Sequence, residues 1–191
     1  MKFADATTRI SYAVVFKSQH VHIKHADWNY RGCGIAALSA VMDYWHDVSI
    51  TNKTTDPETL LDKALAQGAY RENIGWSHSG LALLACSYGY NSFNKDIALQ
   101  SPTPATQNEA FDQLIVHLND GPVIASVFPQ FNPTRGGGHL VIITGWDGIH
   151  IFINDPDEPD EIKGRKQISR EQFMKSFKQR FVVIQPSNFS K

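Results

Sequence analysis

Cys33 has the sequence surroundings of a reactive thiol. It lies between Gly32 and Gly34, at the start of a segment in which apolar residues recur every three or four positions. Such spacing predicts a helix with one buried face, whose N-terminal amides and dipole would stabilise a nucleophilic thiolate. Small neighbours would also let a substrate carbonyl approach the sulfur. In a second interpretation, Cys33 is simply a small apolar residue at a helix start.

A thiol nucleophile needs an imidazole within hydrogen-bond reach, and His139 is the best candidate among the eight histidines. It follows three glycines and begins an apolar segment that predicts a strand, a rigid support for the ring. Asp147-Gly148 predicts a tight turn into a returning strand. Because that strand would end near His139, either Asp155 or Asn154 could orient the imidazole, and side-chain alternation allows only one of them to face it.

His20, His22 and His25 form a histidine-rich segment, and His20 would share one face of an extended chain with His22. Imidazoles bind transition metals, but no cysteine or second spaced histidine pair accompanies these three. We therefore expect a solvated loop without a metal, and no cofactor. Cys86 lies in an apolar segment and is expected to be inert core.

Periodicity and capping residues predict five helices. They begin at Cys33, after Asp56, at Ser77 or Ser79, at Asn108 and after Ser169. Apolar and β-branched runs predict strands at 12–16, 122–128, 140–146, 149–153 and 180–185. Because most helices precede an antiparallel sheet, the fold class is predicted as α+β. We expect one domain over residues 1–191, with a helical part at about 30–120 and a sheet part at about 121–186.

The composition argues against several classes of protein. Lys and Arg number 18 against 19 Asp and Glu, so a basic surface that binds nucleic acid is not expected. The apolar runs are too short to cross a bilayer, and the first ten residues lack the apolar core of a secretory signal. A secreted and a cytoplasmic location both stay open. We expect a monomer.

Four motifs in order along the chain resemble those of papain-like bacterial cysteine peptidases of the bacteriocin-leader-processing type. They are FKSQ at 16–19, GCGIAALSAVMDYW at 32–45, GGGHLVIITGWDG at 136–148 and INDP at 153–156. ISREQFMKSF at 168–177 is similar to the family's helix after the Asp-Pro pair. The sequence is most similar to the stand-alone relatives, the peptidase family thirty-nine-like proteins, over most of its length.

The resemblance implies a papain-like fold, with the nucleophile at a helix N-terminus in a helical part that packs on the antiparallel sheet. It implies Cys33 as nucleophile, His139 as general base and then acid, and Asp155 as the residue that orients His139. In the family, a glutamine upstream of the cysteine donates to the oxyanion, and Gln19 matches it. Its separation from the cysteine, 14 residues, exceeds that in compact members, and Asn29 is a competing amide.

Together these features predict a cysteine-dependent peptidase or amidase that forms an acyl-thioester intermediate, with a peptide or protein as substrate. Two alternatives stay open: an acyl or amide transferase on the same triad, and a catalytically silent papain-like binding module. Specificity is expected to depend on the loops at 69–78 and 128–135. The sequence does not identify the substrate.

Overall fold

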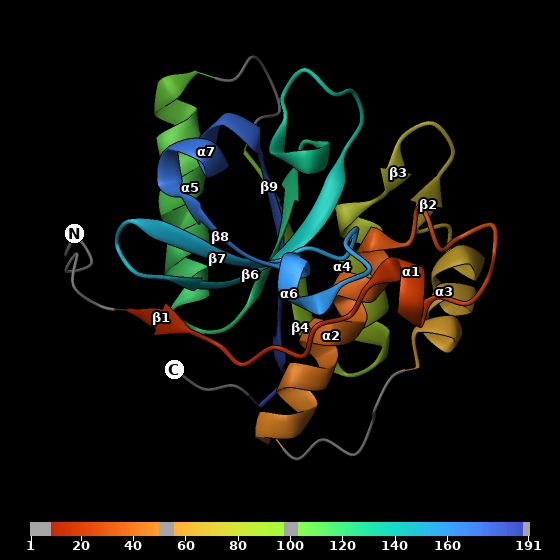
Figure 1. The fold of residues 1–191 in the computed structure, drawn as a ribbon. Coiled ribbons are helices and arrows are strands. Elements are labelled where there is room, and N and C mark those ends of the chain that lie inside the picture. The colour runs from red at the N-terminus through yellow and green to blue at the C-terminus, as the bar shows by residue number, and fades with distance from the viewer. Residues whose placement is uncertain (1–8, 50–55, 98–102, 189–191) are drawn as a thin grey trace.

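A seven-stranded antiparallel sheet forms the centre of the described part of the chain. The structure, a computed structural model, describes residues 9–49, 56–97 and 103–188 (Figure 1). Six strands lie in the order β4-β9-β5-β6-β7-β8, and β1 pairs with β6 outside this path. The strands are β1 (Ile10–Ser11), β4 (Tyr90–Asp96), β5 (Val123–Val127), β6 (His139–Trp146), β7 (His150–Asn154), β8 (Arg165–Ser169) and β9 (Phe177–Pro186). A separate hairpin pairs β2 (Tyr70–Arg71) with β3 (Gly75–Trp76).

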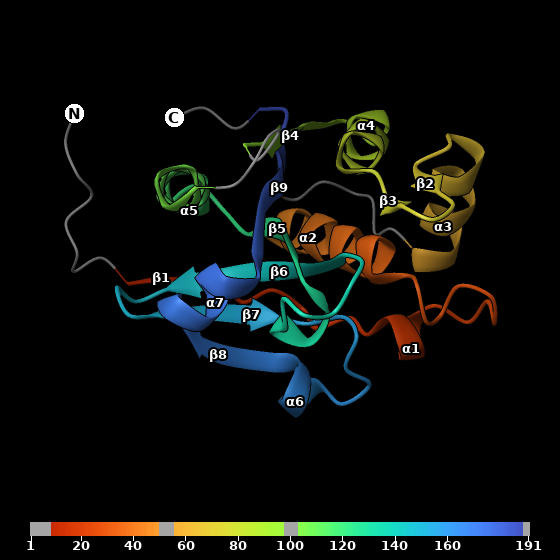
Figure 2. The ribbon, with the colours of Figure 1, turned by 90° about the horizontal axis from the view of Figure 1, so that it is seen from above.

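Helices cover both faces of this sheet, with α2 and α4 on one side and α5 on the other (Figure 2). The helices are α1 (Gln19–His22), α2 (Cys33–Ser49), α3 (Pro57–Ala66), α4 (His78–Ser87), α5 (Pro104–Leu118), the 3-10 turn η1 (Pro129–Phe131), α6 (Glu161–Gly164) and α7 (Arg170–Ser176). Within the described ranges, no helix has the length and apolar character that a membrane span requires.

Strand β5 shows how the sheet supports two hydrophobic cores. Ile124 packs in the core beneath α2, α3 and α4, whereas Val123 and Ala125 pack in the core beneath α5 and α7. This follows from the alternation of side chains along a strand. Because both faces are covered, all residues of the strand are buried, and all but Ser126 are apolar.

Helix α2 is more deeply buried than its periodicity predicts. The sequence pattern indicated one buried face, yet residues 34–42 are all buried. The reason is its place between the sheet and two other helices, since α2 contacts β6 on one side and α3 and α4 on the other. A helix enclosed in this way is a rigid support for a residue at its N-terminus.

Several predicted helix ends are confirmed by their capping contacts. Asp56 accepts a hydrogen bond from the Thr59 amide, with Pro57 as the first helical residue, and Ser77 accepts from the Gly80 amide. Helix α5 begins at Pro104, earlier than the predicted Asn108. The helix begins four residues earlier because Thr103 and Thr106 form a capping box, with Pro104 at the first helical position.

The hairpin of β6 and β7 is confirmed, and its turn is fixed by Asp147. The Asp147 carboxylate accepts hydrogen bonds from the amides of Ile149 and His150. The register pairs Ile142 with Asn154, so residue 155 leaves the sheet close to the start of β6. Sequence and structure therefore agree on the local geometry that brings the end of β7 to His139.

Other strand predictions were wrong or missing. The strand predicted at 12–16 is absent, and the pairing occurs at β1, Ile10–Ser11, instead. β4 and β8 were not predicted, although β4 pairs with β9 along its whole length. The boundary at residue 121 does not separate helices from strands, because β4 precedes it and α6 and α7 follow it.

Candidate active site

Cys33 is the first residue of α2 and is half-buried, with a free thiol. The Gly32 carbonyl accepts hydrogen bonds from the amides of Ile35 and Ala36, which begins the helix immediately before the cysteine. The Cys33 amide is therefore among the first amides of the helix, which have no partner within the helix itself. Thiol and amide together face the region where a helix favours negative charge.

The glycines on either side of Cys33 are required by packing. A Cβ at Gly32 would lie 2.1 Å from Cδ1 of Ile23, and one at Gly34 would lie 2.7 Å from Cγ of Trp76. The sequence argument assigned these glycines to substrate access. The structure shows that they let α1 and the β2-β3 hairpin close tightly around the cysteine.

The His139 imidazole lies at the start of β6 and contacts Asp155. Its Nε2 atom is 2.6 Å from Oδ1 of Asp155, and the two residues are 7% and 2% exposed. Asn154 points elsewhere, and its amide donates to the carbonyl of Val14. Of the two residues that the sequence left open, Asp155 is the one that contacts the imidazole.

His139 and Asp155 each stabilise the charged form of the other. Burial alone would lower the pKa of His139, but hydrogen bonds to Asp155 and Cys33 and the charges of both raise it to about 10. Burial alone would raise the pKa of Asp155, but His139 and then Lys166 hold it well below its usual range. The Cys33 thiol is therefore close enough to the imidazole to raise its pKa. Because Nε2 faces Asp155, Nδ1 is the ring nitrogen left to exchange a proton with sulfur.

Lys166 extends this network from β8. Its ammonium donates to Oδ2 of Asp155 at 2.6 Å and to Oε1 of Glu158 at 3.1 Å. Each carboxylate oxygen of Asp155 therefore has a cationic partner. Oδ1 also accepts from the backbone amide of Asp157 at 3.1 Å, which fixes the carboxylate in one orientation.

Gln19 meets the same turn from the opposite direction. The side chain of Ser18 caps α1, and the Gln19 backbone amide donates to the carbonyl of Pro156 at 2.9 Å. Its buried Nε2 donates to Oδ1 of Asp157 at 2.8 Å, and its Oε1 has no hydrogen-bond partner. The turn at 155–157 thus contacts both His139, through Asp155, and the candidate oxyanion donor Gln19, through Pro156 and Asp157.

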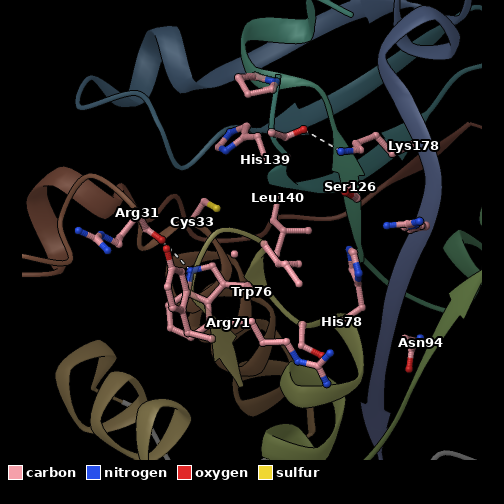
Figure 3. A pocket seen from close by; sticks show the side chains of 18 of the residues that line it. Arg31, Cys33, Arg71, Trp76, His78, Asn94, Ser126, His139, Leu140 and Lys178 are labelled. Atoms are coloured by element: carbon pink, nitrogen blue, oxygen red, sulfur yellow. Dashed lines mark hydrogen bonds between the residues drawn. The ribbon is translucent and has the colours of Figure 1, made fainter. Parts of the chain in front are cut away.

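A cleft of about 670 Å³ connects these residues. Gln19, Cys33 and His139 all line it, and Asn29 is not among the lining residues. Figure 3 shows Cys33 near Trp76 and His139, with Lys178 and His78 farther along the cleft. Both loops named from the sequence contribute: Tyr70, Arg71, Ile74, Gly75, Trp76, Ser77 and His78 from the first, and Pro129 from the second.

Two sequence expectations outside the cleft were wrong. Cys86 is exposed on α4 rather than buried in the core. His20 and His22 lie in the short helix α1 and not in an extended segment, and His20 contacts the side chain of Asp157 at 3.0 Å. Among the described residues, no group of three His, Cys, Asp or Glu side chains could hold a metal ion.

Sequence reasoning missed Lys166, Asp157 and Lys178. Each reaches the site through a tertiary contact that the sequence pattern does not show. Asp157 had one available signal, because it lies two residues beyond Asp155 in the same turn. Lys166 and Lys178 had none, since their places depend on how β8 and β9 pair in the sheet.

Comparison with solved structures shows a papain-like fold shared with C39 peptidases. A double glycine motif protease from an AMS/PCAT transporter, solved in complex with the leader peptide, is 20% identical with a TM-score of 0.60, covering 95% of this chain and 97% of that one. A putative C39-like peptidase from Bacillus anthracis is 17% identical with a TM-score of 0.65, covering 96% and 100%. Xylellain, a cysteine protease from Xylella fastidiosa, is 12% identical with a TM-score of 0.57, covering 94% and 86%. The predicted fold class, α+β and papain-like, is confirmed.

A comparison with curated proteins finds no match. The model of the Peptidase_C39 like family, in contrast, matches residues 12–182. This range contains Gln19, Cys33, His139 and Asp155, and it confirms the resemblance inferred from the four sequence motifs. The chain belongs to the Peptidase_C39 like family of cysteine peptidases.

Proposed function

We propose that the protein cleaves peptides through a triad of Cys33, His139 and Asp155, with Gln19 as oxyanion donor. One observation carries the proposal. The buried contact of 2.6 Å between His139 and Asp155 lies beside a free thiol at a helix N-terminus, in a cleft open to substrate. Membership of a peptidase family supports the same assignment.

In the first step, the Cys33 sulfur attacks the scissile carbonyl. The thiol proton passes to His139, and the resulting imidazolium is stabilised by the carboxylate of Asp155. The high pKa of His139 favours this ion pair over the neutral pair. The new carbon–sulfur bond leaves a negative charge on the former carbonyl oxygen.

Two donors are placed to stabilise that oxyanion. The Cys33 amide lies at the start of α2, and Gln19 contributes its side-chain amide. Nε2 of Gln19 carries two hydrogens, of which Asp157 takes one, so the other is free for the oxyanion. Asp157 acts as a positioning residue, since its contact keeps the amide nitrogen toward the cleft.

Collapse of the intermediate breaks the carbon–nitrogen bond, and the leaving amine takes the proton from His139. The acyl group stays on Cys33 as a thioester. His139 then deprotonates a water that attacks the thioester, and a second oxyanion forms at the same donors. Release of the acid restores the Cys33 thiol. Acylation and deacylation therefore use the same set of residues.

A peptide is the substrate that the cleft fits best. Its volume, about 670 Å³, exceeds the need of a single side chain, and its lining mixes polar with apolar groups. A related structure, the double glycine motif protease, was solved with a leader peptide, which supports a peptide ligand for this chain also.

The test is covalent labelling with an uncharged peptide that carries a carbonyl electrophile, followed by mass spectrometry. We expect modification at Cys33, and none after Cys33→Ala. The exposed Cys86 supplies a matched control within the same molecule, because it is an accessible thiol outside the cleft. Labelling of Cys86 in preference to Cys33 would overturn the proposal.

Turnover separates the proposed hydrolase from its alternatives. A peptidase releases a free acid, whereas a transferase gives an amide product only when an amine is supplied. A silent binding module would bind peptides but would leave Cys33 unmodified. Product mass after incubation with and without a primary amine therefore distinguishes the three functions.

A further inference from the structure

The end of the cleft along β9 carries charge that the proposed triad does not use. Lys178 and Arg180 both line the cleft, together with His78 from the start of α4. Figure 3 shows Lys178 and His78 on the side of the cleft away from Cys33, with Leu140 between His78 and the cysteine. These side chains border the same space as the nucleophile and are therefore open to the same ligand.

The backbone of β9 places both cations in the cleft. Opposite Ser126, the pairing of β5 with β9 shifts from Ala125–Phe181 to Val127–Phe177, which leaves a bulge in β9. Gln179, at its centre, is buried and has a φ of 57°, a conformation that few residues other than glycine adopt. Such bulges redirect side chains, and backbone strain of this kind is common beside functional sites.

Lys178 is a half-buried cation without a carboxylate partner among the described residues. Its ammonium donates to the carbonyl of Gly137 at 2.7 Å and lies 5.0 Å from the ring centre of Phe128. Burial and the charge of Arg180 lower its pKa. A cation in this position is stabilised when an anion binds, because the charge-assisted hydrogen bond replaces part of the hydration that the ammonium lost on burial.

The neighbouring side chains of Arg180 and His78 also favour a bound anion. Arg180 contacts Asp96 through Nε at 3.0 Å, and this one carboxylate balances only one of the two cations. Nε2 of His78 is buried and has no hydrogen-bond partner. Burial and then the charge of Arg180 lower the pKa of His78, so its ring is neutral at pH 7 and can donate a hydrogen bond.

We propose that Lys178, Arg180 and His78 form a subsite for a carboxylate of the peptide substrate, and that Lys178 sets the preference for it. This inference rests on the proposed peptidase function. The ligand is the side chain of an Asp or Glu close to the scissile bond. A free C-terminal carboxylate has the same chemistry and is distinguished by the test.

The test uses peptides blocked at both ends, with Asp, Asn, Glu or Gln at each position around the scissile bond. We expect the acidic residue at one position to raise kcat/KM about tenfold over its amide, as a charge-assisted hydrogen bond would. A second series ends at that position with either a free acid or an amide. A preference confined to the free acids of this series would overturn the side-chain assignment.

Variants of Lys178 connect the preference to this residue. Lys178→Gln should remove the preference, Lys178→Glu should reverse it so that the amide is cleaved faster than the acid, and Lys178→Arg should retain it. The readout is the ratio of acidic to amide substrate, because a shift of the Gly137 loop next to His139 would slow both substrates equally. Lys175→Gln removes an equal charge from an exposed side chain of α7, and as the matched control it should keep the wild-type ratio.

The failure of this inference can be told apart from failure of the proposed function. If the uncharged probe labels Cys33 but acid and amide peptides react equally, the carboxylate subsite is wrong and the peptidase stands. The same holds if Lys178→Gln keeps the acidic preference. If the probe does not label Cys33 and no peptide is cleaved, both proposals fall.

Discussion

At the His139 end of the cleft, opposite charges meet in short contacts, whereas at the β9 end the ammonium of Lys178 contacts a carbonyl and an aromatic ring. Asp155 contacts His139 and Lys166, each at 2.6 Å, and Lys166 also contacts Glu158. Lys178 donates to the Gly137 carbonyl at 2.7 Å and has no carboxylate partner among the described residues. Both ends border one cleft, and Arg180 at the β9 end is paired with Asp96, so the difference between the ends lies in Lys178.

This difference distinguishes residues that orient the general base from residues that bind a charged group of the substrate. A buried charge with its partner in place is held in one orientation, which a general base requires. A half-buried charge without a counter-ion costs free energy until a ligand supplies one. We interpret the first end as the reacting centre and the second as a site for substrate charge.

The largest expected effect is at the paired end, on changing Asp155→Asn. The amide cannot stabilise the imidazolium as the carboxylate does, so we expect turnover to fall by about 10³-fold. The pKa of His139 should fall too, and the alkaline limb of the pH–rate profile should move to lower pH. Asp62→Asn on the exposed face of α3 is the matched control. An unmoved alkaline limb would contradict the role of Asp155.

The same pair predicts a pH window of stability. The pKa of His139 is raised from 6.5 to about 10, so its contribution is complete below 6.5 and lost as the pH rises through 10. The pKa of Asp155 is lowered from 3.8, so its contribution is present above that value and lost as the pH falls below it. Urea unfolding of wild type and Asp155→Asn should therefore differ most between about pH 4 and pH 6.5. A constant difference across pH would contradict the coupling.

Gln19→Ala tests whether the turn at 155–157 also serves the oxyanion. Removing one donor should lower kcat by about 10²-fold with a smaller change in KM, because the interaction strengthens in the transition state. Asn29→Ala is the control, since Asn29 does not line the cleft. If Asn29→Ala shows the large loss of kcat and Gln19→Ala does not, the two amides must exchange roles.

Lys166→Gln weakens the pairing without touching the reacting atoms. Asp155 would keep its contacts with His139 and the Asp157 amide but lose its cation, so we expect about tenfold slower turnover and a loss of roughly 1–2 kcal/mol in unfolding free energy. Lys166→Arg should restore most of both, because it keeps the charge. If Lys166→Gln matches the wild type in stability and rate, Lys166 takes no part in positioning Asp155.

The paired end could be predicted from sequence because its central contact is nearly local. One turn, Asp147-Gly148, returns the chain to His139 after sixteen residues, so the side chain next to the imidazole follows from strand geometry. The position of Cys33 is equally local, since a helix start is marked in the sequence itself. What the pattern could not decide was which of Asp155 and Asn154 faces the ring, because a bulge in β6 changes the alternation.

The open end could not be predicted, because it depends on pairing between distant strands. Lys178 enters the cleft through a bulge where β9 meets β5, and β4, which supplies Asp96, was not recognised as a strand. Single-sequence patterns carry no signal for such pairings or for a positive φ at Gln179. The contact of Gln19 with Asp157, 138 residues apart, was out of reach for the same reason.

The smallest effect is expected for Cys86→Ala, which separates exposure from reactivity. Cys86 is exposed in the last turn of α4, and its thiol donates to the Ser92 carbonyl at 3.5 Å. The C-terminal end of a helix opposes a thiolate, and no imidazole contacts this sulfur in the described structure. We expect unchanged probe labelling at Cys33, turnover within twofold of wild type, and unfolding free energy within about 0.5 kcal/mol. A loss of more than about 1 kcal/mol in urea unfolding would instead support the buried role that the sequence suggested.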